Sequence, residues 1–138
     1  METTNAKQYI YSKLIADSQI LTLVGQRIFD SYVPESVSTT QFPAIVYQLY
    51  SPGDDLSNVG GIRVWADLSY IIKAIDKSSD STIASSIADR IDQLLHRTSN
   101  VQYKIQTCLR VRPIEYRETL PQVEYVHVGG IYNFKVSN

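Results

Sequence analysis

The chain has 138 residues, a formal net charge of −1, 43% hydrophobic residues and 20% charged residues. These values are typical of a globular protein, and we expect a single domain spanning residues 1–138 that folds without disulfides or a structural metal. The near-neutral charge excludes a global attraction to nucleic acid or to an anionic membrane. The one cysteine, Cys108, excludes a disulfide within the chain and a cysteine-rich metal site, and it suits a reducing compartment.

The N-terminal residues METTNAKQY lack the basic region and apolar run of a signal peptide, and no apolar stretch is long enough to span a bilayer. Tyrosine is abundant, with ten residues against three phenylalanines and one tryptophan. Because tyrosine is frequent both in strands and at protein interfaces, this excess fits either a set of sheet residues or a surface that meets a partner.

The start of the chain predicts two helices followed by a short strand. Residues 5–16 carry apolar side chains at four-residue spacing, as on one face of a helix. A second, short helix is expected to be capped by Asp17 or Ser18 and to end at Gly25. Arg27 lies where this helix gives way to the strand, and it is a candidate for contact with the short helix or with a neighbouring subunit.

Two polar segments in the first half of the chain predict loops. Residues 30–42 include Pro34 and form a long exposed loop, while residues 51–61 include Asp54 and Asp55 and predict a hairpin turn. Both loops are candidates for ordering on a partner. The adjacent acids are a weak signal for calcium, and keeping the loop tip soluble or meeting a basic patch on a partner fits them better.

Alternating apolar residues predict two neighbouring strands. Residues 44–50 are apolar on both faces, as in an inner strand, and residues 62–75 alternate along their whole length. The outer face of the longer segment carries Arg63 together with Trp65 and Ile71. Apolar residues on an otherwise polar face indicate a second covering surface, so Trp65 and Ile71 are candidates for a subunit or partner interface. Arg63 on the same face is a further candidate.

The last third of the chain predicts a long amphipathic helix within residues 78–100, with Ser79 or Asp80 as its cap, and then two strands. In residues 101–111 the odd-numbered side chains, Val101, Leu109 and Val111 among them, are predicted to face the core. Cys108 is predicted on the opposite face, as a buried or half-buried structural thiol rather than a nucleophile. Residues 112–122 predict a turn or loop. In residues 124–136 the even-numbered side chains are predicted to face the core.

A cationic stripe is predicted on the even-numbered face of the strand that begins at residue 101, made by Lys104, Arg110 and Arg112, with Arg117 as a further candidate. One interpretation places nucleic-acid phosphates on this stripe. The other is a solvated face, or salt bridges across a subunit boundary. No aromatic residue interleaves with these cations, which favours the second interpretation, and Arg110 and Arg112 join the candidate interface residues.

The residue types that carry catalysis are not grouped in this sequence. His96 and His127 lack the local spacing of a metal site or a catalytic triad, and we expect the first at a helix end and the second solvated on a strand. We therefore expect no enzyme activity, no metal and no cofactor. The order of elements predicts an α+β domain with a largely antiparallel or mixed sheet of about four strands, a long helix packed on one face and an N-terminal helical pair.

Five segments form an ordered pattern along essentially the whole chain: LVGQRIFDSYVP, FPAIVYQL, IRVWADLSY, IASSIADRIDQLL and GGIYNFKV. This order resembles the tail terminator, or tail completion, proteins of long-tailed bacteriophages. The segment SYIIKAIDKSSD departs from the family, because it is longer than the usual step from strand to helix.

The resemblance implies a structural role. Proteins of this family form a hexameric ring on the end of the tail tube, stop its polymerisation and meet the head–tail connector, and DNA passes through the ring without sequence-specific binding. The resemblance thus implies a virion protein of the tail or neck, made in the host bacterial cytoplasm. Its implied partners are copies of itself, the tail tube protein and the connector protein, with a tail sheath protein as a further candidate and no membrane.

Two alternatives stay open at the level of sequence. One is another neck component on the head side of the connector. The other is a monomeric domain that binds nucleic acid or a small molecule through the cationic stripe. A closed ring needs two different complementary surfaces on each subunit. The mass of the purified protein distinguishes a ring from a monomer.

Overall fold

The computed structural model describes residues 2–34, 42–51, 55–57, 60–77 and 80–137, with only the backbone of residues 55–57. The elements, in chain order, are α1 (Glu2–Ile15), α2 (Ser18–Val24), β1 (Ile28–Asp30), β2 (Ala44–Ser51), β3 (Asp55–Ser57), β4 (Arg63–Asp76), α3 (Thr82–Leu95), β5 (Thr98–Asn100), β6 (Ile105–Leu120) and β7 (Val123–Ser137). Asp54 lies outside the described residues.

Seven strands form one mixed sheet within the described part of the chain. Their order is β1-β2-β4-β7-β6-β5, and β3 pairs with the start of β4. Strands β1 and β2 are parallel, whereas the other pairs are antiparallel. The α+β class and the mixed sheet are confirmed, and the sheet has more strands than the expected number of about four. Strands β3 and β5 have three residues each, which is too short for an alternating pattern to show them.

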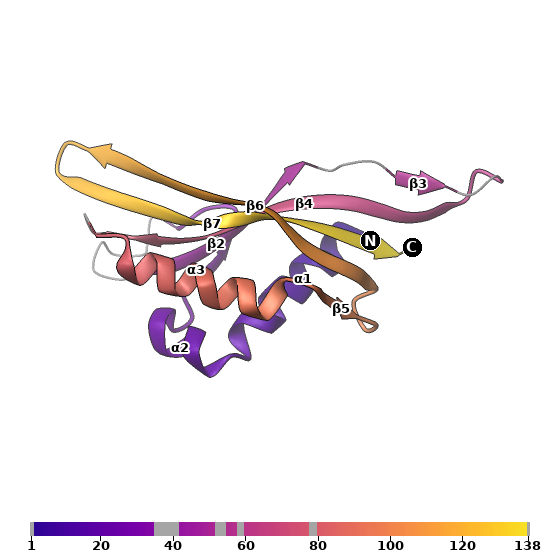
Figure 1. Ribbon diagram of the computed structural model, residues 1–138, viewed down its shortest axis with the longest axis horizontal. Helices are drawn as coiled ribbons and strands as arrows, with labels where there is room; N and C mark the ends of the chain where they lie inside the picture. Colours follow the sequence, from indigo (N-terminus) through magenta and orange to yellow (C-terminus); the bar gives the residue numbers. More distant parts are fainter. Residues whose placement is uncertain (1, 35–41, 52–54, 58–59, 78–79, 138) are drawn as a thin grey trace.

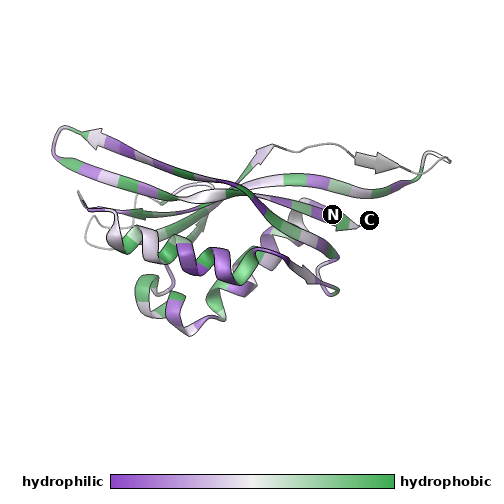
Figure 2. Ribbon diagram, viewed as in Figure 1, coloured by the Kyte–Doolittle hydropathy of each residue, from purple (hydrophilic) through white to green (hydrophobic). Residues whose placement is uncertain are grey.

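All three helices lie on one face of the sheet, as predicted (Figure 1). Figure 2 shows how hydrophobic and hydrophilic residues alternate along the long strands, and the core shows that β4 and β7 each offer one apolar face to these helices. The largest fully buried side chains of this core include Tyr9, Ile10, Leu14, Tyr70, Ile72, Ile87, Ile91, Tyr132 and Phe134. The core thus joins α1 and α3 to the central strands β4 and β7.

The ends of the short helix α2 follow the sequence signals. Asp17 is its N-cap, and the carboxylate accepts a hydrogen bond from the Ile20 backbone N–H at 3.0 Å. Gly25 ends the helix with φ at +60°, in the left-handed region that favours glycine. Helix α3 starts slightly later than predicted: Ser81 is its N-cap, while the Asp80 carboxylate accepts a hydrogen bond from the backbone N–H of Thr82.

Strand β6 begins with Ile105 buried, as predicted, but the predicted faces are reversed after it. Cys108 is fully buried, while Leu109 is 42% and Val111 is 58% exposed. The ladder between β6 and β7 shifts register between Ile105 and Thr107 and again between Arg110 and Arg112. An extra residue in a strand moves the following side chains to the opposite face, which explains the error.

Two hairpins extend from opposite ends of the sheet (Figure 1). At one end, β6 continues through the segment that the sequence predicts as a loop, and it pairs with β7 as far as Leu120 and Val123. At the other end, β3 lies against the start of β4, within the predicted loop 51–61. The predicted loop 30–42 falls largely outside the described residues.

Candidate interaction surface

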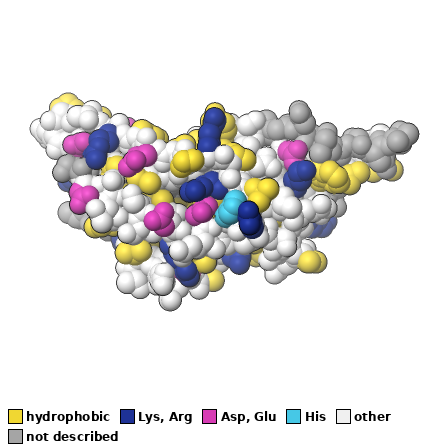
Figure 3. All heavy atoms as spheres, in the orientation of Figure 1, with side chains coloured by type: hydrophobic (Ala, Val, Ile, Leu, Met, Phe, Trp, Pro, Cys, Tyr) yellow, Lys and Arg dark blue, Asp and Glu magenta, His cyan; other side chains and the backbone are white. Residues whose placement is uncertain are grey.

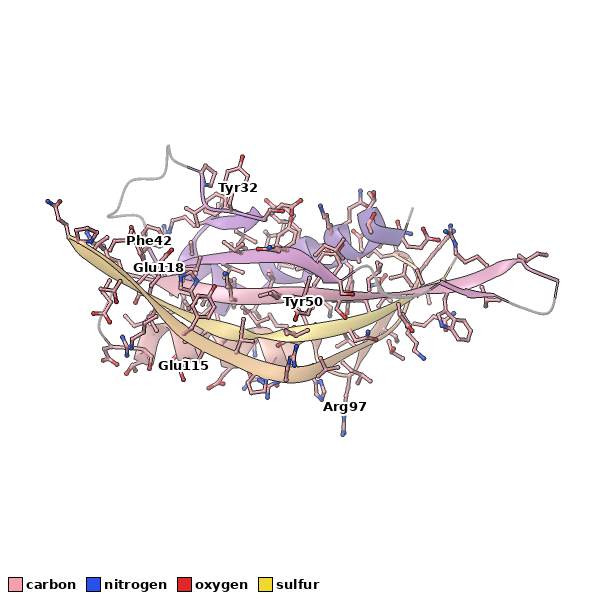
Figure 4. All side chains as sticks on the ribbon, turned by 90° about the horizontal axis from the view of Figure 1, so that it is seen from above. Tyr32, Phe42, Tyr50, Arg97, Glu115 and Glu118 are labelled. Carbon is pink, nitrogen blue, oxygen red and sulfur yellow. The ribbon has the colours of Figure 1, made fainter. Side chains whose placement is uncertain are left out.

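The sheet face opposite the helices carries the candidate site. Figure 4 looks down on this face, and Figure 1 shows that no helix lies over it. We call it the open face. The residues that line it are Val46, Gln48 and Tyr50 of β2; Trp65, Asp67, Ser69, Ile71, Lys73 and Ile75 of β4; Tyr125, His127, Ile131, Asn133 and Lys135 of β7; and Leu109, Arg112, Ile114, Tyr116 and Glu118 of β6.

Cation–aromatic pairs join different strands across the open face: Lys73 of β4 reaches over β7 to Tyr116 of β6, and Lys135 of β7 meets Trp65 of the neighbouring β4. The Lys73 ammonium donates a hydrogen bond to the Tyr116 hydroxyl at 2.6 Å and lies 5.2 Å from the centre of that ring. The Lys135 ammonium lies 5.5 Å from the centre of the Trp65 ring. Such contacts hold lysine side chains flat against the sheet and leave aromatic and cationic groups together on an uncovered surface.

His127 is buried on the open face at 6% exposure, although the sequence predicts it as solvated. The Tyr116 ring stacks on it with 4.4 Å between ring centres, and a Glu118 carboxylate oxygen lies 3.4 Å from its Nε2. Burial, and then the positive charge of Lys73, lower the pKa of His127 below its usual value. The imidazole is therefore neutral near pH 7.

A cleft of about 360 Å³ opens at the end of the open face nearest the β6–β7 turn. Its lining residues are Ser31, Tyr32, Val33, Pro34, Phe42, Val46, Lys73, Ile75, Glu118, Tyr125 and His127. In Figure 4 the labelled Tyr32, Phe42 and Glu118 gather at this end. The cleft thus has mainly apolar walls, and Lys73, Glu118 and His127 form a polar side.

Three buried polar atoms on the open face have no hydrogen-bond partner in the described part of the chain. They are Nε1 of Trp65, Oδ1 of Asp67 and Nδ1 of His127. A buried polar group without a partner is costly, so native proteins satisfy nearly all of them. All three atoms belong to residues on the uncovered face of the sheet.

Several predicted interface residues lie on the open face or at its margins. Trp65 and Ile71 are half-buried on β4, and Arg112 lies near the Tyr50 hydroxyl at 3.4 Å. Pro34 lines the cleft. Arg63, at the exposed start of β4, forms a salt bridge with Glu2 of α1 at 2.7 Å.

The predicted cationic stripe does not form. Arg110 lies on the helix side of the sheet, where its Nε is 3.4 Å from an Asp92 carboxylate oxygen of α3. Arg112 lies on the open face, because the register shift separates the two arginines. Lys104 belongs to the turn between β5 and β6, with φ at +58°. The interpretation of a nucleic-acid site depends on cations aligned along one strand face, and these cations are not aligned.

Of the two further candidates, Arg27 has a role within the fold, and the side chain of Asp55 is not described. The Arg27 Nε donates a hydrogen bond to the Pro43 carbonyl at 2.9 Å, and the Arg27 carbonyl accepts one from the Ile45 N–H, so Arg27 ties the start of β1 to β2. Asp55 belongs to β3 by its backbone, and its side chain is not described. Neither observation tests a contact with a partner.

The cluster of Lys73, Tyr116, Glu118 and His127 is missing from the sequence-based candidates. The sequence pattern places His127 on the outer face of its strand. Its neighbours, however, come from β4 and from the part of β6 for which the sequence predicts a loop. The pairing of distant strands is not visible in one sequence, so local patterns give no signal for this cluster.

Charges of both signs are mixed on the surface shown in Figure 3, without one large patch of a single sign. Among the described residues, no group of three or more histidine, cysteine, aspartate or glutamate side chains is placed to hold a metal ion. Within the same described ranges, every helix is too short or too polar to cross a membrane.

No family model matches the chain, and no curated protein matches it. Among solved structures, a chain in the "Virion of native gene transfer agent (GTA) particle" is similar, with a TM-score of 0.70 and 19% sequence identity. The match covers 94% of this chain and 92% of that chain. At this level of identity, the similarity shows that the two chains share a fold.

Proposed function

We propose that this protein is a structural component of a phage-like virion, without catalytic activity, that forms a ring on the end of the tail tube. In this role it ends tube polymerisation and joins the tail to the head connector. The observation that carries the proposal is the shared fold with a chain of a gene transfer agent virion over nearly the full length of both chains. The resemblance of the ordered sequence pattern to tail terminator proteins supports the position at the tail end.

The open face and the two hairpins support an assembly role. An uncovered sheet face with half-buried Trp65 and Ile71 offers a broad contact area whose centre is partly apolar. The two hairpins project from opposite ends of the molecule, so each subunit presents two different surfaces. Head-to-tail contacts between different surfaces generate rings when the rotation closes.

Locating the protein in particles tests the proposal. Virions produced with an affinity tag on this chain are labelled with gold against the tag and imaged by electron microscopy. We expect label at the junction of tail and head, and we expect tails of uncontrolled length when the gene is deleted. Label on the capsid shell or the tail tip, or tails of normal length after deletion, contradicts the proposed role.

A further inference from the structure

The turn between β5 and β6 presents an almost fully exposed valine on a rigid support. Val101 is 96% exposed. The Tyr103 N–H donates to Asn100 Oδ1 at 2.9 Å, and the Lys104 N–H donates to the Val101 carbonyl at 3.1 Å. The Ser137 N–H of β7 donates to the Lys104 carbonyl at 2.9 Å. Because these bonds fix the turn, placing Val101 in a pocket costs little conformational entropy.

The cleft on the open face offers apolar walls and a carboxylate to such a turn. Val33, Phe42 and Ile75 supply apolar walls for an aliphatic side chain. Glu118 places a half-exposed carboxylate at the cleft, and Lys104 places an exposed side chain beside Val101. Lys73 also lines the cleft, but its ammonium donates a hydrogen bond to the Tyr116 hydroxyl, whereas the Glu118 carboxylate is half-exposed and can pair with Lys104 of another copy.

The turn and the cleft lie at opposite ends of β7. The cleft includes His127, whereas the turn is bonded to Ser137. Ten residues of strand separate them, which corresponds to about 33 Å. The two surfaces therefore do not meet within one subunit, so a contact between them requires two copies of the chain.

We propose that the Val101 turn of one copy inserts into the cleft of the next copy, which makes this pair the head-to-tail contact of the ring. This inference rests on the proposed function for the ring itself. One such contact is small, but in a closed ring every subunit makes it twice, and ring closure converts the last contact into an intramolecular one.

Substitution of Val101 tests the contact. We expect Val101→Asp to weaken self-association at least about tenfold in sedimentation velocity, because a carboxylate replaces the apolar tip. Val111→Asp is the matched control, since Val111 is an exposed valine on β6 away from the turn and the cleft. Association of the Val101 variant equal to that of the wild type overturns the proposal, as does a wild-type protein that stays monomeric at every concentration.

A charge exchange tests the same contact without depending on Val101. We expect Lys104→Glu and Glu118→Lys each to weaken association, and the double variant to recover most of it, because the pair is restored with reversed signs. Circular dichroism checks that each variant is folded. A double variant that associates no better than the weaker single variant overturns the proposal.

The cleft also has other potential occupants, which Tyr32→Asp distinguishes. Tyr32 lines the cleft and is 70% exposed, so its substitution disturbs the cleft with little effect on folding. Weakened self-association supports the inference, whereas intact self-association with lost incorporation into virions assigns the cleft to another virion protein and overturns it. A wild-type protein that is monomeric but located at the tail end contradicts the proposed contact and leaves the proposed function unaffected. Association through the turn in a protein located elsewhere in the particle removes the proposed function alone.

Discussion

Gly129 and Gly130 are adjacent in β7 but differ in what surrounds them. A Cβ on Gly129 would lie 2.2 Å from the Ile72 carbonyl oxygen and 2.5 Å from the Lys73 Cα, both of which are backbone atoms. A Cβ on Gly130 would mainly meet the Arg110 side chain, at 2.7 Å from its Cδ. The backbone of β4 cannot move without disturbing the sheet, whereas an arginine side chain can change its rotamer.

We therefore expect Gly129→Ala to lower the free energy of unfolding by about 1–3 kcal/mol, which is typical of overpacking. Gly130→Ala is the matched control and should cost clearly less. Urea unfolding followed by tryptophan fluorescence measures both variants. Equal losses for the two variants would show that the close approach of β4 to Gly129 is not a constraint.

Cys108 is fully buried, and burial strongly raises the pKa of its thiol. The thiolate is the reactive form of cysteine, so a buried thiol with a raised pKa is protected from reagents. We expect a thiol reagent such as Ellman's reagent to react with the protein only as fast as the protein unfolds, and to titrate one thiol in urea. Rapid labelling of the folded protein would contradict the burial of Cys108 against the helices.

Helices α2 and α3 are tied together by one ion pair. The Asp17 carboxylate caps α2 and accepts hydrogen bonds from the Arg90 guanidinium of α3, at 3.0 Å from Nε and 2.5 Å from Nη2. The hydrogen bonds from Arg90 are the main cause that lowers the pKa of Asp17. A carboxyl group with a lowered pKa stabilises the fold above its unfolded pKa, and it loses this contribution as the pH falls through its folded pKa.

We expect Asp17→Asn to unfold at a lower urea concentration than the wild type near pH 7, although asparagine keeps the N-cap hydrogen bond. The difference should shrink as the pH is lowered from about 4, the unfolded pKa of aspartate, toward more acidic values. Urea titrations across this pH range measure it. A difference that does not change with pH would mean that the charge of Asp17 contributes nothing to the fold.

At the level of elements, sequence patterns predict most of the helices and the long strands of the fold. The Asp17 cap and Gly25 mark the ends of α2, and strict alternation marks β4. Strand β6 is where the patterns fail, because its register shifts reverse the faces of Cys108 and Leu109. A bulge changes no local propensity, so only the pairing with β7 reveals it.

At the scale of the whole molecule, the surface at the open face is only partly predictable. The sequence pattern identifies Trp65 and Ile71 as apolar residues on an outward face, and both lie on the open face. The cleft and the cluster around His127 depend on which strands are neighbours in space. Single-sequence patterns describe one strand at a time, so they identify individual residues of this surface but not their arrangement.

A substitution at Trp65 distinguishes a surface whose hydrogen bonding is complete in the free protein from a surface whose hydrogen bonding a partner completes. Its Nε1–H is buried without an acceptor among the described residues, while Lys135 packs over its ring. Phenylalanine keeps an aromatic face for Lys135 and removes the unpaired donor, so the volume lost is offset by a desolvation cost avoided. We expect Trp65→Phe to change the free energy of unfolding of the monomer by no more than about 1 kcal/mol.

The same change should weaken incorporation into the assembled particle, because a partner's acceptor would then lose its donor at the Trp65 position. Competition between tagged wild-type and tagged Trp65→Phe protein for places in the virion measures this loss, and Val111→Phe, an aromatic substitution at an exposed position of β6, serves as the control. If the variant competes equally while the monomer loses several kcal/mol of stability, Trp65 belongs to the core of the subunit. The open face would then be complete by itself at this position, and the contacts of the assembly would lie at the hairpins and the cleft.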